Sequence, residues 1–441
     1  MIVRLILSNF LSFDNETEFN MLAGSNKTHK HHVYSFSEKL NLLKYASIYG
    51  ANGAGKSNLI KGIEFLRDLI VDGELTSSCD SQKFKLNDEN RKKPIKFELE
   101  LEVNNQILIY GISLNGLIVE EEWLYESGIN SDHKLIFERQ STKDSNTIKL
   151  APKYRKSKHQ KVLADVIEKN ILKSNELLVG KYKELDIEEI RDFVKSVSKI
   201  IVIFPNSKFG ALPSFLSGDH NAKKFANELL NTFDTGVDEI CTQSIDINKY
   251  FGKDDEELKN DILSSMEPDH DLLISYLGKP LLITHDDENK IIVKKAVTKH
   301  LTSDNETILF DIEDESQGTQ RLLDFIPAFH MLYQKGTVFF IDEIDQSIHP
   351  ALLKKLLEKI LNNTDLIGQL IFTTHESNLL DLKLFRQDEI WFAEKDPVSK
   401  SSQIYSLNDF KPRYDLDIRK GYLQGRFGGI PFLGHLSNLD W

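Results

Sequence analysis

The stretch from Tyr49 to Asn58 constrains this chain more than any other part of its sequence. It reads YGANGAGKSN and contains the pattern G-x-x-x-x-G-K-[ST] from Gly50 to Ser57. An apolar run from Leu42 to Tyr49 precedes it, and apolar residues recur at helical spacing from Leu59 to Ile70. The order of strand, glycine-rich loop and helix predicts a P-loop, whose main-chain N–H groups bind phosphate oxygens. The alternative is a glycine-rich turn that merely precedes a helix.

The positions of this loop have predicted roles in binding a nucleoside triphosphate. We expect the Lys56 ammonium to reach the β- and γ-phosphates and the Ser57 hydroxyl to coordinate Mg²⁺. The N-terminus of the following helix adds the positive end of its dipole. The predicted ATP-binding residues are Asn52, Gly53, Ala54, Gly55, Lys56, Ser57 and Asn58.

Composition narrows the class of protein. The chain has 441 residues, enough for two or three domains, and 40% of them are hydrophobic. Its net charge of −13 disfavours a protein that coats nucleic acid or an anionic membrane. Cys79 and Cys241 have no metal-binding spacing, and no apolar run approaches the roughly 20 residues that span a bilayer. We therefore expect a cytoplasmic protein with no membrane partner.

A second motif completes the predicted nucleotide site. Val338 to Ile341 is a continuous apolar run, as in buried parallel strands, and Asp342 and Glu343 follow it directly. We expect Asp342 to hold Mg²⁺ and Glu343 to activate the attacking water. A buried strand with two acidic residues at its end is the alternative, which the P-loop upstream disfavours.

Two further segments flank this strand. Upstream, Ser316, Gly318 and Thr319 lie at the predicted N-terminus of a helix, where they would ordinarily serve as a helix cap. Downstream, the apolar run from Gln369 to Thr374 ends in His375, and a lone histidine after a strand is usually structural. The position of each segment relative to the acidic strand favours a functional interpretation.

In this order, the four motifs resemble those of ABC-type ATPases. Their residues are most similar to those of one prokaryotic branch, the OLD-like ATPases. That branch includes RloA-like ATPases and the AriA-like ATPases of PARIS systems, which act in two-gene antiphage defence. The resemblance covers residues 1–75 and 300–435 and is weak between them. Gln317 and Thr319 depart from the usual L-S-G-G-Q signature. The similar segments are N-F-x-S-F at 9–13, E-S-x-G-T-x-R-L at 315–322, D-E-I-D-x-S-x-H-P at 342–350, T-H-x-S at 374–377 and the stretch at 422–431.

The resemblance implies an α/β fold, an ABC-type P-loop ATPase head with a mixed sheet and an antiparallel β layer, interrupted by a mainly helical insertion. It implies ATP and Mg²⁺ as cofactors, and a γ-phosphate contact from His375. It also implies that Ser316, Gly318 and Thr319 act in trans, as a signature segment that caps the ATP bound by a second copy of the chain. A homodimer or higher oligomer is therefore expected.

The resemblance also implies a biological role. OLD nucleases carry a Toprim domain, and the stretch after His375 is too short for one, so a separately encoded effector protein is expected. The implied function is an ATPase that senses phage infection through a nucleic acid or a phage protein and controls that effector. The alternatives are a DNA-repair or chromosome-maintenance ATPase that resembles RecF or SMC heads, and a transporter ATPase, which would need the usual signature.

The pattern of apolar and polar residues along the chain predicts three regions. For three shorter segments it allows two interpretations each. Residues 1–150 form an N-terminal lobe with the P-loop, 151–275 a mainly helical insertion, and 276–441 a C-terminal lobe with the other motifs. For His29, His31 and His32, a solvated loop is favoured over a metal site. For the basic run from Lys153 to Lys161, a solvated loop is favoured over contact with nucleic acid. For Tyr422 to Pro431, packing on the head is favoured over docking of a partner.

Overall fold

The computed structural model describes residues 1–430 except 39, 129–131, 144, 167–171, 206–209, 211, 219, 234, 253–254, 268–269, 335 and 414–415, and the side chains of 159, 220 and 221. The chain divides into two compact units. The first comprises Met1–Pro205, Leu332–Ile344 and Leu357–Trp441, and the second comprises Asn206–Met331 and Asp345–Leu356. This division differs from the predicted boundaries at 150 and 275, because the residues from 151 to 205 belong to the first unit and strands from both sides of residue 275 pair in one sheet.

A mostly parallel sheet forms the centre of the first unit. In the described part of the chain its six strands have the order β11-β17-β18-β5-β19-β20, and the last pair is antiparallel. Because the strands from β17 to β19 are parallel, the carboxyl ends of β17, β18 and β5 lie at one edge of the sheet. The strands are β5 (Tyr45–Gly50), β11 (Ile200–Ile203), β17 (Val338–Ile341), β18 (Gln369–Thr374), β19 (Ile390–Lys395) and β20 (Ser402–Ser406).

A second, antiparallel sheet covers the P-loop helix. Over the described residues its seven strands have the order β10-β9-β8-β7-β6-β1-β2. Helix α1 (Lys56–Asp72) buries Leu59, Ile60 and Ile63 in a core that also includes Leu5 of this sheet and Ile48 of the parallel sheet. The strands are β1 (Ile2–Ser8), β2 (Thr17–Asn20), β6 (Ile95–Val103), β7 (Gln106–Asn115), β8 (Ile118–Glu126), β9 (Lys134–Ser141) and β10 (Asn146–Leu150).

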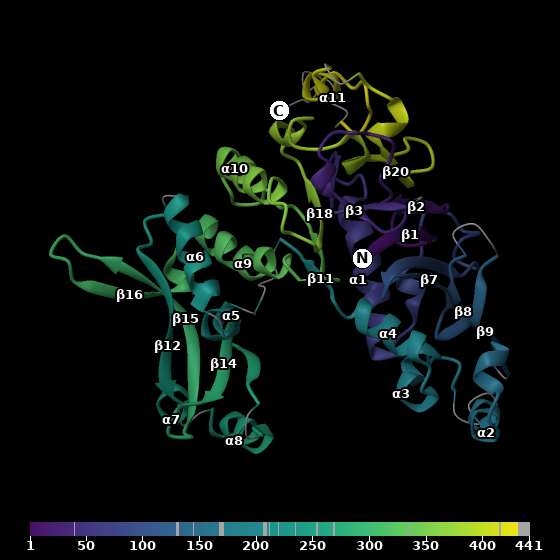
Figure 1. Cartoon of the computed structure of the whole chain (residues 1–441), viewed down its shortest axis with the longest axis horizontal. Coiled ribbons are helices and arrows are strands. Elements are labelled where there is room, and N and C mark those ends of the chain that lie inside the picture. The colour runs from purple at the N-terminus through teal and green to yellow at the C-terminus, as the bar shows by residue number, and fades with distance from the viewer. Residues whose placement is uncertain are drawn as a thin grey trace, which may run out of the picture. The chain divides into compact units, whose positions relative to one another are not determined.

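Shorter elements complete the first unit (Figure 1). Helix α4 (Glu188–Val197) packs on α1 and β6 and buries Ile190 and Phe193. Near it in the chain lie α2 (Lys158–Val166) and α3 (Tyr182–Leu185). The remaining elements are the hairpin β3 (Val33–Ser35) and β4 (Asn41–Leu43), the second half of α10 (Pro350–Leu361), and α11 (Ile418–Leu423).

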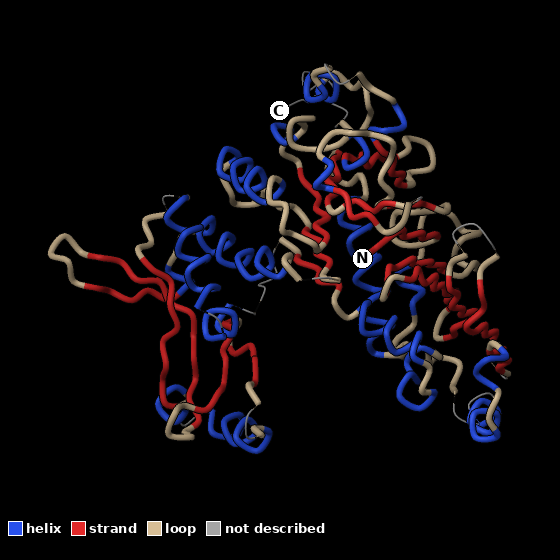
Figure 2. Tube along the Cα trace, viewed as in Figure 1, coloured by secondary structure: helices blue, strands red, loops and turns tan. Residues whose placement is uncertain are grey.

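The second unit is an antiparallel sheet with helices against it (Figure 2). Among its described residues, four strands have the order β12-β15-β14-β13, and β16 pairs with the far end of β15. Helices α7 and α8 pack at one end of the sheet, around Ile247, Ile262 and Val293. The strands are β12 (Glu239–Asp246), β13 (Leu272–Tyr276), β14 (Lys279–His285), β15 (Ile291–Leu301) and β16 (Thr307–Asp311). The helices are α5 (Leu212–Gly218), α6 (His220–Thr232), α7 (Ile247–Tyr250), α8 (Glu256–Ser265) and α9 (Gln317–Met331).

The predicted fold class, α/β with a P-loop sheet, an antiparallel β layer and an interrupting segment rich in helices, is confirmed. Helices predominate between 151 and 275, although this range also contains the strands β11, β12 and β13. The segment up to Pro205 packs with the first unit, and the later part shares a sheet with β14, β15 and β16.

Candidate functional site

The P-loop lies where the sequence predicts it, between β5 and α1. Gly55 precedes α1 with φ of 111°, and Gly53 has φ of 75°, both in the left-handed region that favours glycine. A side chain at Gly50 would overlap the Ala393 carbonyl of the neighbouring strand. The space beside Gly53 is open, since a Cβ at this position would have no neighbouring atom within 4 Å. The glycines therefore bend the loop, keep it close to β19 and leave its tip accessible to a ligand.

The Lys56 side chain is buried and is already directed at this loop. Its Nζ donates to the main-chain oxygens of Gly50 at 2.8 Å and Ala51 at 3.2 Å, and lies 3.1 Å from Nε2 of His375. These contacts hold the ammonium at the loop, where a phosphate would be cradled. The α1 N-terminus beside it supplies amides without partners in the helix, so the residues present fit a bound triphosphate.

Ser57 and Asn58 lie in the first turn of α1 and are partly exposed. The Asn58 amide donates to Ser12 Oγ at 2.8 Å, and Ser402 Oγ donates to the same hydroxyl at 2.8 Å. A side chain at Gly55 would overlap Ser402. The N-terminal segment and β20 thus support the loop from one side, while Ser57 and Asn52 remain accessible.

The two predicted acids follow β17 at the same edge of the sheet. Asp342 is 3% exposed, whereas the Glu343 side chain is 36% exposed, so the two carboxylates have different surroundings. Glu343 has φ of 48°, which turns the chain sharply at the end of the strand. Its carboxylate lies 4.0 Å from Nε2 of His375. Lys56, Glu343 and His375, which come from three separate segments, therefore meet in one place.

Sequence reasoning missed Thr373, which connects the two acids. Its Oγ1 donates to Oδ1 of Asp342 at 2.6 Å and accepts from the main-chain N–H of Glu343 at 2.8 Å. Thr373 is completely buried in β18, beside β17. The sequence signal was a hydroxyl residue two positions before His375, on the predicted strand that follows the acidic strand in the chain.

Replacing Thr373 with valine should lower ATP turnover roughly tenfold, or about 1.4 kcal/mol in the barrier. Valine has a similar shape but leaves the Glu343 N–H without its acceptor and frees the Asp342 carboxylate to rotate. Initial rates of phosphate release measure the effect. Thr374→Val is the matched control, because Thr374 Oγ1 accepts from the N–H of Glu376 instead. Equal turnover in the two variants would contradict this role for Thr373.

The predicted signature residues lie in the second unit, at the N-terminus of α9. Ser316 is exposed, and its Oγ accepts from the N–H of Thr319 at 3.2 Å, as in a helix N-cap. A Cβ at Gly318 would lie 2.8 Å from the Ser347 carbonyl, so glycine permits close contact with the segment after the acidic strand. Glu315, just before the cap, bonds His300 Nε2 at 2.7 Å. The segment is therefore held in place with its polar end exposed.

The segment at 422–430 packs on the first unit. The rings of Tyr422 and Phe427 stack on Phe392 of β19, with centroids 5.5 and 5.9 Å away. The Tyr422 hydroxyl donates to the Gly429 carbonyl at 3.1 Å. The packing prediction is confirmed for these residues, and Pro431 lies outside the described residues.

The prediction of a solvated loop is wrong for one of the clustered histidines. His32 is fully buried, its Nδ1 lies 2.9 Å from Oε1 of Glu389, and its Nε2 lies 3.0 Å from the Leu361 carbonyl. Burial lowers the pKa of His32 to about 4. Glu389 is distant in sequence, which is why no partner was visible from spacing alone.

The basic run at 153–161 is mostly exposed, as predicted. Lys153 pairs with Glu189 at 2.6 Å, and Arg155 lies 3.6 Å from Asp165. These acids offset part of the positive charge that a nucleic acid would need.

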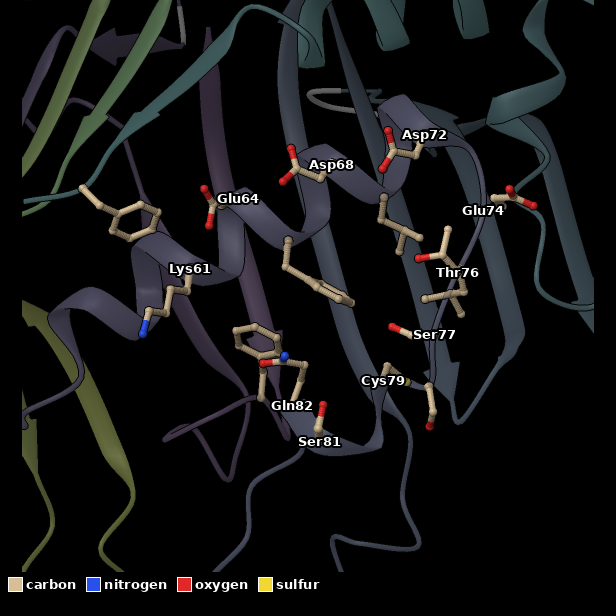
Figure 3. A pocket seen from close by; sticks show the side chains of 16 residues that line it. Lys61, Glu64, Asp68, Asp72, Glu74, Thr76, Ser77, Cys79, Ser81 and Gln82 are labelled. Atoms are coloured by element: carbon tan, nitrogen blue, oxygen red, sulfur yellow. The ribbon is translucent and has the colours of Figure 1, made fainter. Parts of the chain in front are cut away.

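A separate cavity of about 410 Å³ lies along α1 (Figure 3). Glu64, Asp68 and Asp72 line it from successive turns of the helix. Phe10 and Phe65 add aromatic surface. Its carboxylates would repel phosphate groups. It is therefore distinct in chemistry from the P-loop at the start of the same helix.

The fold and the site together define a P-loop nucleotide-binding protein. The chain belongs to the AAA_21 family, described as "AAA domain, putative AbiEii toxin, Type IV TA system", whose model matches residues 46–381. No curated protein matches the chain. Within the described ranges, no helix has the length and apolar character needed to cross a bilayer.

Solved structures similar to this chain include SMC head domains. A structure of the SmcHead bound to the C-winged helix domain of ScpA is 14% identical, with a TM-score of 0.43 over 93% of this chain and 99% of that one. The SMC head domain from Thermotoga maritima is 12% identical, with a TM-score of 0.40 over 92% and 98%. A Smc head domain with an extended coiled coil, bound to the C-terminal domain of ScpA from Pyrococcus furiosus, is 13% identical, with a TM-score of 0.41 over 93% and 99%.

Proposed function

We propose that this protein is an ATP-hydrolysing, ABC-type switch of antiphage defence, in which ATP joins two copies of the chain and hydrolysis separates them. The switch senses infection, through a nucleic acid or a phage protein, and controls a separately encoded effector protein. The observation that carries the proposal is the meeting of Lys56, Glu343 and His375 at one edge of the parallel sheet, next to the buried Asp342.

This arrangement supports hydrolysis rather than binding alone. Lys56 and the α1 N-terminus would hold the phosphates, and Ser57 and Asp342 would hold Mg²⁺, which neutralises charge on the transferred phosphoryl group. The partly exposed Glu343 carboxylate is suited to accept a proton from water, and His375 lies between it and Lys56. Phosphate binding without hydrolysis would not require a second, accessible carboxylate beside Asp342.

The signature segment supports a switch that needs a second copy. Ser316 is exposed at the start of α9, a helix of 15 residues, so its side chain is accessible to an anion on another molecule. In the family that the motifs resemble, this segment completes the ATP site of the opposing head. Ser316, Gly318 and Thr319 are therefore assigned to the ATP of a partner copy.

The defensive role rests on the similarity of the motifs to OLD-like ATPases, together with the family description. That description names a toxin and a TA system, which favours a controlled toxic or defensive activity over a metabolic one. The net charge of −13 favours an effector or a trigger that approaches through a specific site over general binding to nucleic acid.

Titration calorimetry with Mg·ATP, followed by light scattering of the wild-type protein and Lys56→Ala, tests the core of this proposal. We expect heat and an increase in mass for the wild type, and neither for Lys56→Ala. Absence of both in the wild type would overturn it. Capture of the tagged protein from infected cells, with and without ATP, then tests the effector, and an ATP-independent set of partners would contradict the switch.

A further inference from the structure

His29, His31 and His32 gather in the first unit, at a place separate from the nucleotide site. One ring nitrogen from each lies within 4.8 Å of the others. The ring centroids of His31 and His32 are 4.5 Å apart, and those of His29 and His32 are 4.9 Å apart. Three of the 13 histidines of the chain therefore lie close enough together to offer several ring nitrogens to one ligand.

Local geometry explains the gathering. A 3₁₀ turn spans Lys30–His32, and His29 precedes it with φ of 44°. The His32 N–H donates to the His29 carbonyl at 2.9 Å, which closes the turn, and the rings of the two residues stack at 24°. His31 meets the ring of His32 edge-on at 86°, so nitrogen atoms approach from different directions.

Groups from distant parts of the chain surround the rings. Glu389 bonds Nδ1 of His32 through both carboxylate oxygens, at 2.9 and 3.0 Å, and also accepts from the Arg386 N–H at 2.8 Å. The carbonyl oxygens of Leu361 and Leu382 lie 3.0 Å from Nε2 of His32 and Nε2 of His29. A carboxylate on the far nitrogen of a ligating histidine is the usual second layer of a metal site, because it fixes the ring orientation.

The surroundings of one ring nitrogen are stronger evidence for a bound ligand. Nε2 of His31 is shielded from solvent and has no hydrogen-bond partner among the described residues. An enclosed nitrogen of this kind costs free energy unless it is bonded. Two nearby cations are engaged elsewhere, since Arg386 is paired with Asp388 at 2.7 Å and Lys44 donates to the Leu366 carbonyl at 2.8 Å.

We propose that His29, His31 and His32 bind one Zn²⁺ ion, with the Leu361 carbonyl or water as a fourth ligand and Glu389 as the positioning residue. Imidazole nitrogens suit Zn²⁺ among the common divalent ions and bind it at about 2.1 Å, and the three nitrogens already lie within 4.8 Å of one another. The ion would join the loop at 29–32 to the end of α10 and to the segment before β19. It is thus a structural site, and it is independent of the proposed ATPase activity.

Zinc binding to the full-length, tag-free protein tests this proposal. We expect one equivalent of Zn²⁺ by calorimetry and elemental analysis, a visible absorption band with Co²⁺ as probe, and a rise in Tm on addition of zinc. His31→Gln should weaken binding more than tenfold and abolish the rise in Tm, and Glu389→Gln should weaken it about 10–100-fold.

His270→Gln is the matched control, because His270 is 77% exposed and lies outside the cluster. Its affinity for zinc should equal that of the wild type. The Tm of each variant without metal separates a loss of zinc binding from a loss of folding. Absence of stoichiometric binding in the wild type, or equal affinity in His31→Gln, would overturn the proposal.

Discussion

Replacing Glu343 with glutamine should reduce ATP turnover by about 10²–10⁴-fold while Mg·ATP remains bound. Glutamine keeps the shape of the side chain, and the main-chain bond to Thr373 and the φ of 48° do not depend on the carboxylate. Only the group that accepts the proton of the attacking water is lost. Because hydrolysis would separate the joined subunits, the variant should also accumulate as a larger species.

Phosphate release measures the loss of turnover, and retention of labelled ATP with light scattering measures the trapped state. Glu18→Gln is a suitable control, since the Glu18 side chain has a similar exposure of 42% and lies on β2. Turnover close to that of the wild type in Glu343→Gln would remove Glu343 from the catalytic role. Loss of ATP binding would instead assign the carboxylate to binding.

Mixing two inactive variants should restore about a quarter of wild-type activity, if Ser316 acts on the ATP of a partner copy. One variant is Lys56→Ala, which removes the phosphate-binding ammonium. The other is Ser316→Asp, because aspartate preserves the helix cap but places a negative charge where the γ-phosphate would lie. Half of the random dimers contain one copy of each, and one of their two sites combines an intact Lys56 with an intact Ser316.

The choice of Ser316→Asp follows from the structure. A substitution at Gly318 would press on the Ser347 carbonyl and disturb the fold, whereas Ser316 is exposed. Ser316→Asn preserves the cap and adds no charge, so it should lose less activity than Ser316→Asp, and it separates the effect of the charge from that of the lost hydroxyl. If the mixture stays inactive at every ratio although light scattering shows mixed dimers, the segment does not act in trans.

The parts of the site that sequence could predict are those encoded locally. Three features of the site are properties of short segments: the positive φ at Gly53 and Gly55, the apolar run of β17 and the periodicity of α1. The types of residue in each segment are therefore enough to predict them. The resemblance to ABC-type ATPases implied that Lys56, Glu343 and His375 serve one nucleotide site, and the structure brings them together because parallel strands place their carboxyl ends at one edge. The roles assigned to these residues remain predictions.

By itself, the sequence determined that this chain has a P-loop α/β core and which residues stand at the ends of its strands, since turn glycines and apolar periodicity act within a few residues. Only the tertiary structure decided that Thr373 would join the two acids, and that His32 would be buried against Glu389, 357 positions away. It also decided that strands on both sides of residue 275 would share a sheet. These outcomes depend on pairings between distant segments, whose free energy comes from packing and hydrogen bonds that no short stretch of sequence specifies.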